Sequence, residues 1–114
     1  MEVKIWHNPN CGSSRAALER LESKGVRPEI YLYLKEPPSK NDLKAVLKRL
    51  GIRARDLLRP KEQAAEDLGL YEGASDSKVL AAMAENPRLI QRPIVISAKG
   101  AVLARPPLRV DEVL

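Results

Sequence analysis

The order of strand-like and helix-like segments at the start of the chain restricts the fold more than any other feature of the sequence. Val3–His7 alternates apolar and polar side chains, which is typical of a short strand. Helical spacing then predicts a helix over 13–24, with Gly25 as its C-cap. Val26–Leu34 predicts a second, well-buried strand, whose apolar side chains at period two are Ile30, Leu32 and Leu34. Together these segments make a βαβ unit, whose strands we expect to be parallel.

Helical patterns follow. Pro37-Pro38 ends the βαβ unit, and Ser39 with Asp42 three residues later forms a capping-box pattern for a helix that stops at Gly51. Further helical segments are expected at Ala54–Leu58, Lys61–Leu68 and from Ser75 or Asp76 to about Asn86.

The last part of the chain reads as a hairpin and a short helix. Ile94–Ser97 predicts a strand, Lys99-Gly100 a turn and Ala101–Ala104 the returning strand. Val110–Leu114 is expected to form a terminal helix.

This order, βαβ, then helices, then a hairpin and a last helix, is that of the thioredoxin-like fold, an α/β class, with a helical insertion before the hairpin. At 114 residues the chain is long enough for one domain with a modest core. We therefore expect a single thioredoxin-like domain over 1–114, with the helical insertion at 39–87. In that fold a cis-proline before the third strand faces the start of the first helix, and Pro93 has this place.

Cys11 is the only cysteine, and it lies where the first predicted strand joins the first predicted helix. A helix N-terminus offers free backbone N–H donors and a positive dipole end, which favour a thiolate and also attract anions. The first hypothesis is therefore a nucleophilic thiolate at an oxyanion site, and the alternative is a buried structural cysteine. No disulfide can form within the chain, because a second cysteine is missing.

Three arginines each precede a proline and are candidates to bind an oxyanion: Arg59, Arg92 and Arg105. Arg92 and Arg105 flank the predicted hairpin, so antiparallel pairing should bring them together near the loop of Cys11. Arg59 falls in the helical segment, where periodicity does not place it.

Three residues close to Cys11 in the sequence are further candidates for the site: His7, Ser14 and Arg15. Arg15 gives the spacing Cys-x3-Arg, which argues against a phosphatase loop of the Cys-x5-Arg type. As an imidazolium, His7 would lower the thiol pKa, but it is equally consistent with an inert strand-end histidine. Ser14 has the position of the second thiol in a Cys-x-x-Cys motif, and either caps the helix or donates to the thiolate.

Composition narrows the classes of function. A net charge of +5 suits a small anionic substrate. Nucleic-acid binding is not expected, because the basic residues are dispersed and aromatic residues make up only 4%. Apolar stretches long enough for a membrane span are absent, and no metal site is expected from one histidine and one cysteine. Because an export signal is also missing, we expect a cytoplasmic protein.

Taken together, the motifs resemble those of the glutaredoxin-coupled arsenate reductases, the ArsC-like family of thioredoxin fold. The run His7-Asn8-Pro9-x-Cys11-Gly12-x-Ser14-Arg15 is similar to the N-terminal motif of that family. The other matching landmarks are Leu58-Arg59, Arg92-Pro93-Ile94-Val95 and Arg105-Pro106, with Tyr31-Leu32-Tyr33-Leu34 in the second strand.

The resemblance implies reduction of arsenate to arsenite. Cys11 would attack arsenic, while His7 would help to keep the thiol ionised, and the oxyanion would be held by Arg59, Arg92 and Arg105. Without a second cysteine, reducing equivalents would come from glutathione and glutaredoxin rather than from a bound cofactor.

Two other functions stay open. A glutathione-linked thiol transferase would use Cys11 and Ser14 as a monothiol glutaredoxin does, and would ignore arsenate. A regulator of the Spx type would bind a protein partner without catalysis, although the usual Cys-x-x-Cys switch of those proteins is missing here.

Overall fold

The structure is a computed structural model that describes residues 2–114, and the chain forms two compact units. The first unit contains the N-terminal segment through Tyr33 together with Arg92–Leu114, and the second is Leu34–Gln91. The unit that contains the helices thus begins and ends slightly outside the predicted range of 39–87. That the whole chain acts as one domain stays a prediction.

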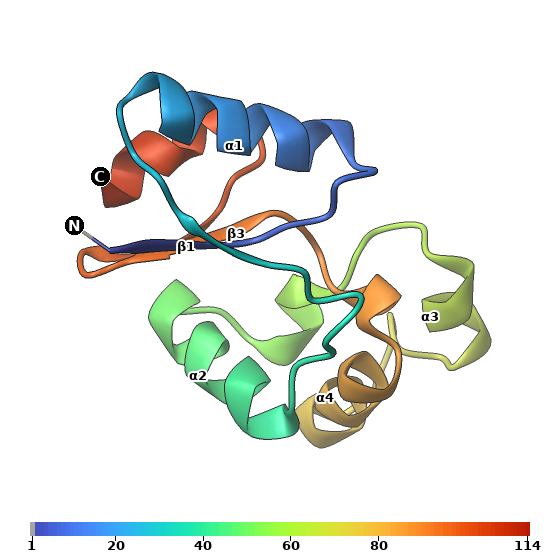
Figure 1. Cartoon of the computed structure of the whole chain (residues 1–114). Coiled ribbons are helices and arrows are strands. Elements are labelled where there is room, and N and C mark those ends of the chain that lie inside the picture. Colours follow the sequence, from blue (N-terminus) through green and yellow to red (C-terminus); the bar gives the residue numbers. More distant parts are fainter. Residues whose placement is uncertain (1) are drawn as a thin grey trace. The chain divides into compact units, whose positions relative to one another are not determined.

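The first unit contains a four-stranded sheet in the order β2-β1-β3-β4 (Figure 1). β1 (Val3–Trp6) pairs in parallel with β2 (Glu29–Tyr31) and antiparallel with β3 (Ile94–Ser97). β3 and β4 (Gly100–Leu103) form the hairpin. This topology confirms the predicted α/β, thioredoxin-like fold and the parallel βαβ unit.

The helix of the βαβ unit, α1, spans Gly12–Ser23 and ends one residue earlier than predicted, so Gly25 is not the C-cap. Lys24 is the C-cap, and Gly25 follows it with a φ of 79°. The Val26 N–H donates to the Leu21 carbonyl at 3.0 Å, which closes the helix end. Glycine suits this place because other residues rarely adopt that left-handed conformation.

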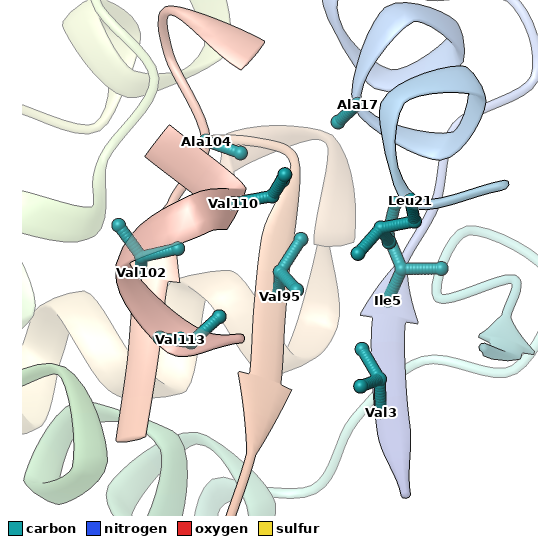
Figure 2. Packing of buried hydrophobic residues seen from close by; sticks show 9 residues of the cluster. All are labelled: Val3, Ile5, Ala17, Leu21, Val95, Val102, Ala104, Val110 and Val113. Atoms are coloured by element: carbon teal, nitrogen blue, oxygen red, sulfur yellow. The ribbon is translucent and has the colours of Figure 1, made fainter. Parts of the chain in front are cut away.

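The core of the first unit lies between one face of the sheet and two helices, α1 and the 3₁₀ helix η3 (Pro107–Val113), which lie side by side (Figure 1). Figure 2 shows the buried cluster, which consists of Val3, Ile5, Ala17, Leu21, Val95, Val102, Ala104, Val110 and Val113. The apolar positions of the alternating pattern in β1 are explained by this packing, since Val3 and Ile5 both point into the core.

The prediction for the second strand was wrong in its burial. β2 is only three residues long and lies at the edge of the sheet. Ile30 is 49% exposed and Leu34 is 36% exposed, whereas the pattern predicted that both face the core. Side chains at period two lie on one face of a strand, and they are buried only where another element packs on that face.

Aromatic packing explains which side of this segment is buried instead. Tyr33 is 1% exposed, and its ring stacks on Trp6 with centroids 6.2 Å apart. Tyr31 meets the same indole edge-on at 5.1 Å. These ring contacts accompany the burial of Tyr33, while Tyr31 is half-buried.

The second unit is helical, as predicted. Its elements are α2 (Lys40–Leu50), η1 (Ala54–Leu57), α3 (Gln63–Asp67), α4 (Asp76–Glu85) and η2 (Pro87–Leu89). The capping box of α2 is present, because the Asp42 N–H donates to Ser39 Oγ at 3.0 Å and Ser39 N–H donates to the Asp42 carboxylate at 3.0 Å. α3 is shorter than the predicted helix over 61–68.

Two boundaries of the C-terminal segment also differ from the predictions. The hairpin turns at Ala98-Lys99, and Gly100 is already the first residue of β4. The last helix begins at Pro107 rather than Val110 and is 3₁₀ in form. Within residues 2–114 no helix combines the length and the apolar character that a bilayer crossing requires.

We expect Leu21→Ala to lower the free energy of unfolding by about 2–5 kcal/mol, because it opens a cavity between α1 and the sheet. Urea unfolding of the whole chain measures this change. The matched control is Leu108→Ala, since Leu108 is 59% exposed, and the expected change there is within about 0.5 kcal/mol. Equal effects of the two substitutions would contradict the packing in Figure 2.

Candidate active site

Cys11 lies at the N-cap of α1, where its backbone is extended (φ −106°, ψ 123°). The Cys11 N–H donates to the Asn8 carbonyl at 3.0 Å, so a tight turn connects β1 to the helix. The Arg15 N–H in turn donates to the Cys11 carbonyl at 3.0 Å, which is the first hydrogen bond of the helix. The residue is only 8% exposed. The thiol is thus held at the positive end of α1, as the sequence predicted.

Opposing effects act on the pKa of Cys11. Burial raises it, because a thiolate is poorly solvated there. The backbone N–H groups of Ser14 and Ser13 lower it, as do the positive charge and the hydrogen bond of Arg92. The stabilising interactions outweigh burial, so the pKa of Cys11 lies below its ordinary value. The sulfur therefore has more thiolate character near neutral pH than a free cysteine.

Strand register explains how Arg92 reaches the thiol. Trp6, the last residue of β1, pairs with Ile94, the first residue of β3. The loop that follows β1 and the segment that precedes β3 therefore adjoin the same end of these two paired strands. Ile94 also pairs with Leu103 at the end of β4, and Arg105 Nη1 donates to the Arg92 carbonyl at 3.4 Å. Arg92 is buried at 8% exposure, whereas Arg105 is exposed.

The peptide bond between Arg92 and Pro93 is cis, as predicted for the proline before the third strand. The Arg105–Pro106 bond is also cis, which the sequence did not indicate. The Pro93 carbonyl accepts from the Ala104 N–H at 2.9 Å, so the hairpin pairing extends to this proline. That Pro93 faces the thiol stays a prediction.

His7 and Ser14 are buried together behind the thiol loop. His7 Nδ1 and Ser14 Oγ lie 2.6 Å apart in a hydrogen bond, and Ser14 Oγ also accepts from the Asn8 N–H at 3.0 Å. Burial and the nearby charge of Arg15 lower the pKa of His7, because both disfavour the charged imidazolium. Ser14 therefore ties α1 to the loop through its hydroxyl and supports the thiolate through its backbone N–H.

These contacts bear on two expected roles. The groups that lower the pKa of Cys11 are backbone N–H groups and Arg92, whereas His7 bonds to Ser14. An imidazolium at His7 that keeps the thiol ionised, and a Ser14 hydroxyl that donates to the sulfur, both stay predictions. Arg15 is exposed, and its Nη1 donates to the Pro9 carbonyl at 2.9 Å, so this side chain also supports the loop.

Arg59 belongs to the second unit. Leu58 forms an isolated antiparallel bridge with Ile90, and the Arg59 N–H donates to the Leu89 carbonyl at 2.8 Å. The guanidinium contacts Glu62, with Arg59 Nη1 and Glu62 Oε2 3.3 Å apart. Because Cys11 is part of the other unit, a shared site for Arg59 and Cys11 stays a prediction.

Sequence reasoning missed the surroundings of Arg59. The phenol of Tyr71 donates to the Arg59 carbonyl and accepts from the Glu62 N–H at 2.7 Å. Glu62, three residues after Arg59, is a visible candidate for an ion pair in the sequence. Nothing in the local pattern indicates Tyr71. In the part of the chain that the structure describes, no group of three or more His, Cys, Asp or Glu side chains is arranged to hold a metal ion.

Comparisons with known proteins identify the family. The model of the ArsC family matches residues 6–113. The Escherichia coli protein YfgD, described as uncharacterized, is 42% identical over 115 residues, which are 99% of this chain and 97% of that protein. An arsenate reductase of Escherichia coli is 41% identical over 105 residues, which are 91% of this chain and 74% of that protein.

Solved structures agree with this similarity. The structure of an arsenate reductase from Vibrio cholerae aligns with a TM-score of 0.96 at 42% identity, and the alignment covers 100% of this chain and 98% of that chain. With the family model matched over residues 6–113, and with relatives of this identity aligned along nearly their whole length, the chain belongs to the ArsC family.

Proposed function

We propose that this chain is an arsenate reductase that acts through the thiolate of Cys11. The observation that carries the proposal is the placement of the single cysteine at the N-terminus of α1, where backbone N–H groups and Arg92 lower its pKa. Relatives named arsenate reductase, at 41% identity and at 42% identity with a TM-score of 0.96, support arsenate as the substrate.

In the proposed reaction, the Cys11 sulfur attacks arsenic, so an As–S bond forms and an As–O bond breaks. The oxygen leaves as water after protonation. The Arg105 guanidinium donates to the Arg92 carbonyl, and Arg92 is hydrogen-bonded with the thiol, which suits the two arginines to hold an oxyanion at the attacking sulfur. The participation of Arg59 rests on the family motif Leu58-Arg59.

The electrons must come from outside the chain. Reduction of As(V) to As(III) requires two electrons, which two thiols supply when they are oxidised to a disulfide. With one cysteine the chain supplies one thiol at most, and it must regain that thiol in each cycle. The balanced net reaction converts arsenate and two external thiols to arsenite, a disulfide and water. Glutathione and glutaredoxin, which act in the reducing cytoplasm, are the proposed donors, and no bound cofactor is needed.

The first test is arsenate-dependent NADPH oxidation with glutathione, glutaredoxin and glutathione reductase supplied. We expect turnover by the wild-type protein and none by Cys11→Ser, because a hydroxyl is a far weaker nucleophile than a thiolate. A circular dichroism spectrum establishes that both proteins are folded. The absence of turnover by folded wild-type protein, at any arsenate concentration, would refute the proposal.

Arginine substitutions separate the reductase from a glutathione-linked thiol transferase. We expect Arg92→Ala and Arg105→Ala each to lower kcat/KM for arsenate about 100-fold, because each loses a charge-assisted hydrogen bond to the oxyanion. A thiol transferase, by contrast, would still exchange glutathione with a small disulfide after either substitution. The control is Arg27→Ala, at an exposed position. If all three variants reduce arsenate equally, these arginines do not bind it.

Alkylation by iodoacetamide as a function of pH tests the electrostatics of the thiol. Because Arg92 lowers the pKa of Cys11, Arg92→Ala should move the midpoint of the rate profile to higher pH and slow alkylation at neutral pH. Arg92→Lys keeps a charge and should fall between that variant and wild type. Arg27→Ala should leave the midpoint in place. A midpoint in Arg92→Ala equal to that of wild type would show that Arg92 does not act on the thiolate.

A further inference from the structure

The turn that carries Arg59 has an unusual backbone. It runs from Arg59 through Pro60 and Lys61 to Glu62, where α3 is about to begin. Lys61 has a φ of 59°, a left-handed conformation that residues other than glycine seldom adopt. Such a conformation persists only where surrounding contacts hold it.

One phenol joins both ends of this turn. The Tyr71 hydroxyl donates to the carbonyl of Arg59 and accepts from the N–H of Glu62 at 2.7 Å. Tyr71 follows Leu70, which is fully buried, so the segment that carries the phenol is anchored in the core of this unit. The two hydrogen bonds use the donor and one acceptor site of the same oxygen, and they set the distance between the first and last residues of the turn.

The side chains of the same two residues also meet. Arg59 Nη1 lies 3.3 Å from Glu62 Oε2, and the Glu62 side chain is only 16% exposed while that of Arg59 is 37% exposed. The Glu62 carboxylate is therefore partly buried. Its position depends on the conformation of the turn, which the hydrogen bonds of Tyr71 stabilise. Through one nitrogen it orients a guanidinium that has five donor hydrogens in all.

We infer that Tyr71 is a positioning residue for Arg59 and thereby tunes the affinity of the enzyme for its oxyanion substrate. The inference rests on the proposed function, because it takes Arg59 as an oxyanion ligand. An arginine side chain loses much rotamer freedom when it binds, so a guanidinium oriented in advance binds more tightly than a mobile one. Tyr71 does this through the backbone of the turn and through Glu62, without touching the substrate.

The test uses Tyr71→Phe, which removes only the hydroxyl, in the coupled arsenate assay on the full chain. Loss of the two hydrogen bonds should raise KM for arsenate about fivefold, while kcat stays within about twofold. The matched control is Tyr31→Phe, the same deletion of one oxygen on β2, which should leave KM unchanged. The iodoacetamide profile of Cys11 should be unaltered in both variants, whereas general unfolding would disturb it.

A double-mutant cycle shows whether Tyr71 acts through Arg59. If it does, KM for Arg59→Ala should be no higher after Tyr71→Phe is added, whereas independent effects would multiply. A wild-type KM in Tyr71→Phe, or multiplied effects in the double variant, would overturn the inference and leave the proposed function intact. If Arg59→Ala itself has the wild-type KM, the inference falls because Arg59 is not a ligand, and the Cys11→Ser comparison still decides the proposed function.

Discussion

The antiparallel pairing of β1 with β3 is the constraint on which the candidate site depends. It joins two segments that lie far apart in the sequence, and its register sets Trp6 opposite Ile94. A shift of this register by one residue would turn Val3 and Ile5 away from α1 and would also separate the thiol loop from Arg92. The burial of these side chains therefore stabilises the register, and the register keeps Arg92 close enough to Cys11 to lower the pKa of the thiol.

Within that frame, the reactivity of Cys11 comes from a balance rather than from one strong interaction. Burial opposes the thiolate, and hydrogen bonds from a helix terminus and from Arg92 favour it. These donors act only if α1 keeps its position relative to the loop. The hydrogen bonds of Ser14 with His7 and with the Asn8 N–H maintain that position. His7 thus contributes to the geometry of the loop through its hydrogen bond with Ser14, and the charged role implied by the resemblance stays a prediction.

Short sequence patterns predicted well those features of the fold that depend on neighbouring residues, such as helix caps and helix ends. The capping box at Ser39 formed as expected, and α1 ended within one residue of the prediction. Strand topology was sufficient to predict that Arg92 lies near the loop of Cys11. Period two did not show which face of β2 would be covered, so Ile30 was placed wrongly. Tyr71 lies in no periodic segment, and its contact depends on how a loop folds back, which no pattern in the chain encodes.

The single thiol also has a consequence for oxidative damage. When an oxidant converts a cysteine to a sulfenic acid, a neighbouring thiol usually traps it as a disulfide, which protects the sulfur from further oxidation. This chain has no second cysteine to do so, and Cys11 is the thiol whose lowered pKa makes it susceptible. The same external thiols that would complete turnover would then also have to reduce the sulfenic acid before further oxidation inactivates the protein. A cell depleted of such thiols would lose the protein itself as well as its reductant.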